Sequence, residues 1–385
     1  MSRIVIIGAG IIGLSIAYKL SLRGHKVIVV DKEGDVSRHQ SGRNSGVLHC
    51  GISYQPGSLK AKLSREGYIQ MINFCGTNSI NFDVCGKLIV SKNKSEINKL
   101  FEIGIENGIN NIRILNRSDA MKIEPNIADG FYLYIPEEGI VSFKEVCECL
   151  RTHIINNNGE VLTNFRVKAI DSDRKFIEDK RENRESYDLL INAAGIYSDN
   201  IAKMCGIKLS MRQIPFGGRY YRISNKFFNN LIYPCPDIDM PFLGIHLTRT
   251  VGGNYMIGPN AMIRLSKINY TWRNFNFIEF INIFTYCGLW KFILRNRKFT
   301  LVQIREYISR RYFLREMKNL IAQEPADFEK LPLGIRAQAI NTNGELVSDF
   351  VIKRNKEEVH ILNAPSPGAS ASLAIADYII KKYIL

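Results

Sequence analysis

The chain has 385 residues, of which 45% are hydrophobic and 23% are charged, as in an ordinary globular protein. These values exclude a disordered tail, a collagen-like repeat and a small disulfide scaffold, and the length predicts two or three domains. The formal net charge of +15 is less ordinary. It suits an acidic substrate, an anionic membrane surface or nucleic acid, and equally a surface on which lysine has accumulated without function.

The first elements form a compact nucleotide-binding pattern. Residues 3–13 predict an apolar strand that enters a glycine-rich turn, residues 14–20 a helix, and residues 26–30 a second strand ended by Asp31. The turn has the G-x-G-x-x-G spacing, in which Gly8 permits the tight turn, Gly10 lets the backbone approach a pyrophosphate, and Gly13 allows close helix packing. Asp31 is placed to bind a ribose. The pattern predicts a dinucleotide without deciding between NAD and FAD.

Two further segments bear on the cofactor. Residues 37–57 are rich in Ser, Gly, Asn and His without periodicity, which predicts a long functional loop. Residues 189–195 predict an apolar strand that ends in small residues at Ala194 and Gly195, either a simple tight turn or a segment beside a cofactor. This segment resembles the one found in flavoproteins, which favours FAD. The loop residues that would then lie over the pyrophosphate and flavin are Arg43, Asn44, Ser45 and Gly46.

The remaining pattern alternates between helices and strands. Helices are predicted over residues 59–74, 94–107 and 142–156, the last with a capping box of Ser142 and Glu145. Short strands between 215 and 262 predict an antiparallel sheet, and the C-terminal stretch predicts a strand (359–362), a turn (363–368) and a helix (369–382). We therefore predict an α/β chain. In it a Rossmann-like FAD-binding domain (1–82, 140–208 and 330–385) is interleaved with an antiparallel-sheet α+β substrate domain (83–139 and 209–329).

Several long motifs, spread in order over nearly the whole chain, are more specific than the glycine pattern. Together they resemble the L-2-hydroxyglutarate dehydrogenase/oxidase family of the FAD-dependent D-amino-acid-oxidase superfamily. The resemblance implies FAD-dependent oxidation of L-2-hydroxyglutarate to 2-oxoglutarate, with electrons passing on to quinone or O₂. The motifs are residues 41–52, 54–61, 232–237, 241–246, 258–261, 334–339 and 363–369.

One segment departs from the family pattern. The family usually has Pro-Phe-Arg-Gly-Glu-Tyr-Tyr where residues 215–221 of this chain place Gly217 and Arg219 at the third and fifth positions. If this segment faces the substrate, the site for the second carboxylate is altered. An oxidase or dehydrogenase of another 2-hydroxy acid or of an amino acid is therefore an alternative.

Oxidation of a 2-hydroxy acid requires a carboxylate anchor and a base. A guanidinium grips a carboxylate through two parallel hydrogen bonds, so Arg336 is the predicted anchor, a role that the superfamily resemblance also implies. His49 is the preferred base and His246 the second candidate, because imidazole titrates near neutral pH. The candidates for the distal carboxylate of a dicarboxylate substrate, which the sequence does not rank, are Lys60, Arg219 and Arg249.

The C-terminal turn is the last predicted part of the cofactor site. A helix N-terminus after this turn would face the flavin and stabilise its reduced anionic form, although an ordinary capped helix fits the same residues. No cysteine in the turn offers a covalent flavin link. The turn residues assigned to the cofactor are Pro367, Gly368, Ala369 and Ser370.

The cellular setting is predicted from weaker signals. The eight cysteines lack zinc or redox spacing, so we expect free thiols, no metal and, because the first strand starts at once, a cytoplasmic protein without a cleaved leader. Residues 277–294 are apolar and aromatic, and basic residues follow at 295–298. They predict either a packed core helix or peripheral contact with the inner face of the cell membrane, near quinone. A tRNA-modifying flavoprotein is a remote alternative, but no RNA-binding pattern is found and no nucleic acid is expected.

Overall fold

The computed structural model describes residues 1–223, 226–236, 242–268, 270, 275–325 and 327–384. Its first large sheet has six strands, five of them parallel. Along β1, Ile4 and Ile6 pack into one hydrophobic core and Val5 and Ile7 into another, so both faces are covered and the strand is apolar throughout. In sheet order the strands are β22 (Val351–Asn355), β23 (Glu358–Asn363), β13 (Leu189–Asn192), β1 (Arg3–Ile7), β2 (Lys26–Val30) and β9 (Glu160–Leu162).

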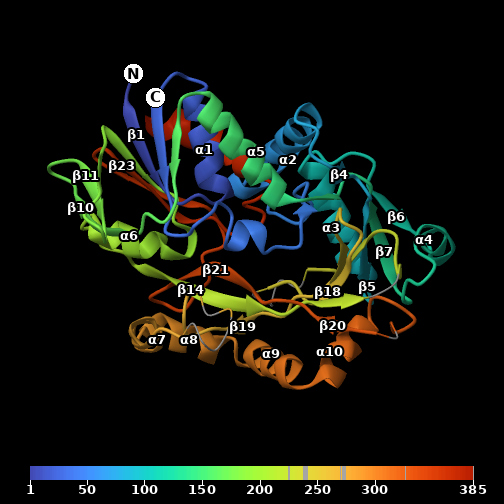
Figure 1. Cartoon of the computed structure of the whole chain (residues 1–385). Helices are drawn as coiled ribbons and strands as arrows, with labels where there is room; N and C mark the ends of the chain where they lie inside the picture. The colour runs from blue at the N-terminus through green and yellow to red at the C-terminus, as the bar shows by residue number, and fades with distance from the viewer. Residues whose placement is uncertain (224–225, 237–241, 269, 271–274, 326, 385) are drawn as a thin grey trace.

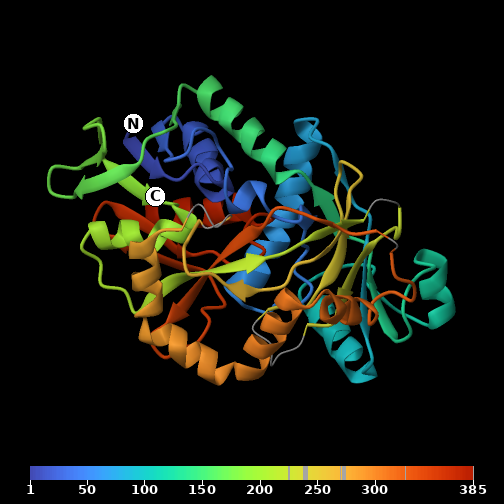
Figure 2. The ribbon, with the colours of Figure 1, turned by 60° about the horizontal axis from the view of Figure 1, so that its bottom comes forward.

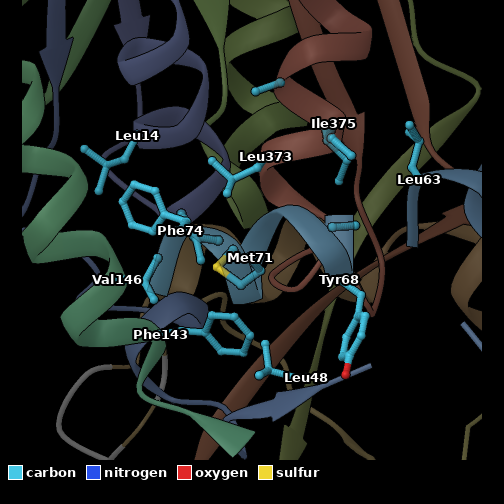
Figure 3. Close-up of a cluster of buried hydrophobic side chains, with 14 of the residues drawn as sticks. Leu14, Leu48, Leu63, Tyr68, Met71, Phe74, Phe143, Val146, Leu373 and Ile375 are labelled. Carbon is cyan, nitrogen blue, oxygen red and sulfur yellow. The ribbon is translucent and has the colours of Figure 1, made fainter. Parts of the chain in front are cut away.

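Helices cover one face of this sheet. Helix α1 (Ile11–Ser21) packs between α5 (Phe143–Asn156) and α11 (Ser372–Ile379), and α2 (Leu59–Thr77) packs on α11. Figure 3 shows Leu14, Phe74, Val146 and Leu373 from these four helices gathered in one cluster. The second core includes residues from α6 (Ser198–Met204) and from a three-stranded sheet of β10 (Val167–Asp171), β11 (Phe176–Asp179) and β12 (Arg184–Ser186).

The second large sheet has eight strands and is mostly antiparallel. Only β16 and β5 run parallel to each other among its pairs in the described residues. This arrangement confirms the antiparallel sheet predicted between residues 215 and 262. In sheet order the strands are β20 (Glu329–Lys330), β15 (Tyr221–Ile223), β18 (Tyr255–Gly258), β17 (His246–Arg249), β16 (Leu231–Pro234), β5 (Lys87–Ser91), β7 (Phe131–Ile135) and β6 (Arg113–Leu115).

Two small sheets lie with these larger ones. One contains β19 (Met262–Ile263), β14 (Met211–Gly218) and β21 (Gly334–Asn341), and the other β3 (Val47–Leu48), β8 (Gly139–Val141) and β4 (Phe82–Asp83). Figure 1 places β14 and β21 in the middle of the molecule, between the six-stranded sheet and the lower helices. Strands of the two large sheets alternate along the chain, while the domain boundaries given above stay a prediction.

A row of helices runs along one side of the molecule. It consists of α7 (Phe277–Phe284), α8 (Cys287–Arg295), α9 (Arg297–Ile308) and α10 (Arg310–Met317), which follow one another below β14 and β19 in Figure 1 and come forward in Figure 2. No helix in the described residues has by itself the length and hydropathy of a membrane span. Helices α7 and α8 reach them only together, with a 60° bend between them.

The predicted helix and strand positions agree closely with the structure in the N-terminal half. The remaining helices are α3 (Lys94–Glu106) and α4 (Arg117–Ile123). The Ser142 side chain accepts a hydrogen bond from the Glu145 N–H at the start of α5, as the capping box predicts. At the C-terminus the predicted helix start at Ala369 is wrong, because turns continue through residue 371 and α11 begins at Ser372.

Candidate active site

A cavity of about 810 Å³ lies at the carboxyl ends of β1, β2 and β13 and extends to the eight-stranded sheet. Its lining combines the nucleotide-binding turn, the 40–54 loop, strand β21 and the 364–370 turn. Ligands of parallel α/β sheets bind at this end of the strands, and the volume suits a large ligand. The cavity therefore brings the predicted cofactor and substrate residues into one site.

The glycine-rich turn is built for close approach. Gly8 has φ +115°, and a Cβ on it would lie 2.4 Å from the Ala193 oxygen. A Cβ on Gly13 would lie 2.0 Å from the Gly8 oxygen, so Gly13 serves helix packing and does not line the cavity. Gly8 and Gly10 do line it, and the only atom near a Cβ on Gly10 is the Ser41 hydroxyl, at 3.2 Å. A side chain at position 10 would occupy space that a phosphate needs.

Asp31 lies at the end of β2 and lines the cavity. Its carboxylate accepts backbone hydrogen bonds from Ala9 at 2.7 Å and from Glu33 at 2.9 Å. Each carboxylate oxygen has more than one acceptor site, so both keep capacity for a ribose hydroxyl. Asp31 thus fixes the turn and remains open to the ligand.

The 40–46 loop forms the next part of the lining. Arg43, Asn44 and Ser45 face the cavity, whereas Gly46 has φ +71° and lies outside it. The Asn44 side chain shapes the loop, because it donates to the Ser41 oxygen at 2.8 Å and accepts from the Gly46 N–H at 2.8 Å. The loop is also tied to strand β21 through the Ala337 N–H, which donates to the Gln40 side chain at 3.0 Å.

The two remaining predicted cofactor segments also line the cavity. Ala194 and Gly195 follow β13, and all four predicted residues of the C-terminal turn (367–370) face the same space. The Ser370 hydroxyl accepts from the His49 backbone N–H at 3.1 Å and donates to the Val47 oxygen at 3.2 Å. This turn therefore holds the backbone of the segment that carries the predicted base.

The substrate end of the cavity contains both candidate histidines and Arg336. Arg336 projects from β21, where it lies opposite Phe216 of β14. Within the described residues its guanidinium has no ion-pair partner, so it is available to a ligand carboxylate. His49, His246 and Lys60 line the same cavity.

Two buried charged residues that the sequence did not predict, Glu138 and Lys87, lie beside His49. Its Nδ1 lies 3.3 Å from Glu138 Oε2, and the same oxygen accepts from Lys87 Nζ at 2.6 Å. Glu138 and Lys87 have only 0% and 3% of their side chains exposed. Burial would raise the pKa of Glu138, but Lys87 and His49 hold it at about 2. Burial lowers the pKa of His49, and Glu138 opposes that shift.

His246 has a different environment. Its Nδ1 lies 2.9 Å from the Gly244 oxygen and its ring stacks on Tyr233 at 4.0 Å between centroids. Burial lowers the pKa of His246 to about 3 although the Gly244 hydrogen bond opposes the shift, and Arg336 contributes to the lowering. The imidazole is thus neutral at physiological pH.

The three candidates for the distal carboxylate are separated by the structure. Lys60 on α2 lines the cavity, and its Nζ donates to the Ser348 oxygen at 3.2 Å. Arg219 instead stacks on Tyr307 at 4.1 Å, and Arg249 pairs with Asp83 at 2.5 Å. Neither arginine is part of the cavity lining. Burial lowers the pKa of Lys60 to about 8, against the opposing effect of Asp349, so its ammonium form prevails at pH 7.

The segment that departs from the family pattern does not alter the lining at its changed positions. Gly218 and Tyr220 face the cavity, whereas Gly217 and Arg219 do not. A Cβ on Gly217 would lie 2.9 Å from Cδ of Arg264, so a different arginine fills the space beside this position. The departure therefore bears on packing behind the site.

Comparison with known proteins agrees with this geometry. The family model of the FAD-dependent oxidoreductases matches residues 3–382. The L-2-hydroxyglutarate dehydrogenase of Indibacter alkaliphilus is 35% identical over 97% of this chain and 96% of its own length. The mitochondrial L-2-hydroxyglutarate dehydrogenase of Homo sapiens is 32% identical over 98% of this chain and 87% of its own length.

Solved structures show the same fold. The L-alpha-glycerophosphate oxidase of Mycoplasma pneumoniae, with FAD bound, has a TM-score of 0.79 at 22% identity, covering 99% of this chain and 94% of its own. Glycine oxidase of Bacillus cereus has a TM-score of 0.72 at 17% identity, covering 98% and 96%. The cofactor is FAD, and the glycine turn, with its space for a phosphate beside Gly10, fits it. The chain belongs to the FAD-dependent oxidoreductase family and, more narrowly, to the L-2-hydroxyglutarate dehydrogenase family.

Proposed function

We propose that this protein oxidises L-2-hydroxyglutarate to 2-oxoglutarate. The observation that carries the proposal is the presence of Arg336, His49 and Lys60 in one cavity that is continuous with the dinucleotide-binding turn. Two cations and one neutral base are the groups that a dicarboxylate with a 2-hydroxyl requires. Relatives that carry the name of this activity, at 32% to 35% identity over nearly the whole chain, support the same substrate.

In the proposed reaction Arg336 binds the carboxylate next to the reacting carbon. A guanidinium makes two parallel hydrogen bonds to a carboxylate, which fixes both the position and the rotation of the substrate. His49 then accepts the proton of the 2-hydroxyl group as the C2–H bond breaks and the carbonyl forms. When bound, FAD supplies the chemistry of a hydride acceptor for that C2–H bond. Arg336 and His49 are thus the proposed catalytic residues.

Lys60 is the proposed ligand of the distal carboxylate. Of the three candidates it alone lines the cavity, and within the described residues it has no ion-pair partner. Its Nζ lies 4.5 Å from the centre of the Tyr54 ring, which leaves the ammonium group partly desolvated. A half-buried cation that forms no ion pair within the described residues favours a substrate that brings a second negative charge.

The test of the proposal is anaerobic bleaching of the flavin absorption by a panel of acids. We expect rapid bleaching by L-2-hydroxyglutarate and slow or no bleaching by the D-enantiomer, by L-2-hydroxybutyrate and by amino acids. Bleaching by an amino acid or a monocarboxylate, but not by L-2-hydroxyglutarate, would overturn the proposal. Binding of tRNA with a steep salt dependence would instead support the tRNA-modifying alternative.

For the electron acceptor and the location we propose quinone at an anionic membrane surface, on the inner face of the cell membrane. Support comes from α7 to α9, which expose large apolar side chains, with Leu294 73% exposed, next to exposed Arg297 and Lys298. Such a surface suits the lipid interface. The exposed apolar residues on these helices are Phe277, Ile278, Ile281, Phe284, Trp290, Leu294, Leu301 and Ile308.

Vesicle sedimentation tests the membrane proposal. We expect binding to anionic vesicles that falls with salt, and loss of binding in Leu294→Glu. The matched control is Ile105→Glu, because Ile105 is 54% exposed but lies on α3, away from these helices. Equal binding of both variants would contradict the proposed surface. Faster reoxidation of the reduced flavin by O₂ than by a soluble quinone analogue would contradict quinone as the acceptor.

A further inference from the structure

The most informative group outside the predicted site residues is the buried pair Lys87 and Glu138. The two residues come from different parts of the chain, Lys87 from the start of β5 and Glu138 from the turn between β7 and β8. They meet beside the imidazole of His49, where Glu138 Oε2 accepts a hydrogen bond from Lys87 Nζ at 2.6 Å and lies 3.3 Å from His49 Nδ1. Removing an ion pair from water is costly, so its presence against a reactive histidine calls for an explanation.

The hydrogen-bond chemistry of this group favours one histidine tautomer. A carboxylate can only accept, so His49 can hydrogen-bond to Glu138 only if Nδ1 carries the ring proton. Nε2 then keeps a free lone pair. Lys87 Nζ lies 3.5 Å from the same Nδ1, but its stronger interaction is the shorter contact with the carboxylate. Two N–H groups thus converge on one oxygen of Glu138.

The second oxygen of Glu138 is also occupied. Oε1 accepts from the Cys50 backbone N–H at 3.3 Å, and the Cys50 thiol lies at 3.4 Å. Because Cys50 is the next residue after His49, this contact fixes the backbone that carries the imidazole. Lys87 is further held by the Tyr233 ring, whose centre lies 4.3 Å from Nζ.

We propose that Glu138 and Lys87 are positioning residues for the base. Glu138 fixes the Nδ1–H tautomer of His49, so that Nε2 is the basic nitrogen, and Lys87 keeps Glu138 ionised. This inference rests on the proposed role of His49 in oxidising a 2-hydroxy acid. When His49 takes up the substrate proton, the resulting imidazolium is stabilised by the Glu138 carboxylate at its other nitrogen.

The charged and titratable groups around His49 set the direction of the expected pH effect. After burial, which lowers the pKa of His49, Glu138 raises it, while Lys87 and Lys60 lower it. The histidine also faces Tyr233, at 6.4 Å between ring centres. Loss of the carboxylate leaves only cations near the imidazole, so the pKa of His49 must fall. The rising limb of kcat/KM against pH therefore moves to lower pH in Glu138→Gln.

The kinetic test uses the holoenzyme and follows flavin reduction by L-2-hydroxyglutarate. For Glu138→Gln we expect a fall in kcat on the order of tenfold to 100-fold, little change in KM, and the downward shift of the limb. Glu137→Gln is the matched control, because Glu137 pairs with Arg65 and does not contact His49. A profile for Glu138→Gln that coincides with the control would overturn the inference.

A spectroscopic test does not depend on turnover. The chain has six histidines, so ¹⁵N-histidine spectra of the holoenzyme can be assigned to His49 with the variant His49→Gln. We expect an Nδ1–H tautomer in the parent protein and a mixture in Lys87→Met/Glu138→Met, which removes both buried charges without leaving one unpaired. An unchanged tautomer in the double variant, or an Nε2–H tautomer in the parent, would refute the inference. Failure of L-2-hydroxyglutarate to bleach the parent flavin would refute only the proposed function, because the tautomer of His49 is measured without substrate.

Discussion

Two walls of the same cavity each carry a histidine: the segment after β3 carries His49, and strand β17 carries His246. The surroundings of the two histidines differ in one decisive respect. His49 contacts the carboxylate of Glu138 at 3.3 Å, whereas His246 contacts the neutral Gly244 oxygen at 2.9 Å and the Tyr233 ring. Both side chains line the site and both have a lowered pKa because of burial. Only the first wall supplies a negative charge for a histidine that has gained a proton.

This difference shows that residue type and location do not by themselves identify a base. A histidine that acts as a general base must be neutral before the reaction and sufficiently stable as a cation during it. His246 meets the first condition only, since nearby Arg336 and Lys87 oppose its protonation. We therefore assign proton transfer to His49 and expect His246 to serve packing and the orientation of Tyr233.

The largest expected effect is that of removing the imidazole at position 49. His49→Gln should lower kcat for L-2-hydroxyglutarate by about 10² to 10⁴, the usual contribution of a general base, with a much smaller change in KM. Stopped-flow flavin reduction under anaerobic conditions measures this directly. A loss of less than about threefold would remove the contrast between the two walls and would leave the base unassigned.

The next effect concerns the anchor that both walls share. Arg336→Leu should raise KM by about 100-fold, because a charged hydrogen-bonded pair worth about 3 kcal/mol is lost. Arg336→Lys keeps the charge but loses the planar fork and should recover part of this affinity. If the dependence of the reduction rate on substrate concentration is unchanged in Arg336→Leu, the carboxylate is bound elsewhere.

A smaller effect is expected at Lys60, on the side of His49. Lys60→Met should raise KM for L-2-hydroxyglutarate by about tenfold. A partly exposed ion pair between the Lys60 ammonium and the distal carboxylate contributes about 1 kcal/mol or slightly more. L-2-hydroxybutyrate lacks the distal carboxylate and provides the matched control within the same variant. Equal changes for the two substrates would show that Lys60 affects the site in general and does not select a dicarboxylate.

The cofactor half of the site could be predicted from sequence because its determinants are local. Gly8, Gly10 and Asp31 lie within one strand–helix–strand unit, and the glycine spacing and the strand-end carboxylate can be read from that unit alone, although Ala193 and Ser41 also pack against the turn. Lys87 and Glu138 could not be found in this way. They are 51 positions apart and meet at His49 only through the pairing of strands, which no local pattern reveals.

The three candidates for the distal carboxylate could not be ranked from the sequence for a related reason. Arg219 lies in the two-residue connection between β14 and β15, where no local pattern predicts which side chain enters the cavity. Gly218 and Tyr220 line the cavity and Arg219 between them does not. The predicted helix start at Ala369 is likewise three residues early, because alanine at positions 369 and 371 favours a helix, whereas the turn continues and α11 begins at Ser372.

The smallest effect on activity is expected at His246. Here the two walls are compared through the pH dependence of the free energy of unfolding. His246→Gln should change kcat by less than about fivefold and leave the pH limb in place. The folded pKa of His246, about 3, lies below the unfolded value of about 6.5, so between these values only the unfolded chain binds the proton. Native His246 therefore costs stability as the pH falls, by about 2 kcal/mol between pH 7 and pH 5. Urea unfolding of both proteins at these two pH values should show a loss that is smaller in His246→Gln by about this amount. An equal loss in parent and variant would mean that His246 is protonated in the folded state, and the assignment of the base to the other wall would fall with it.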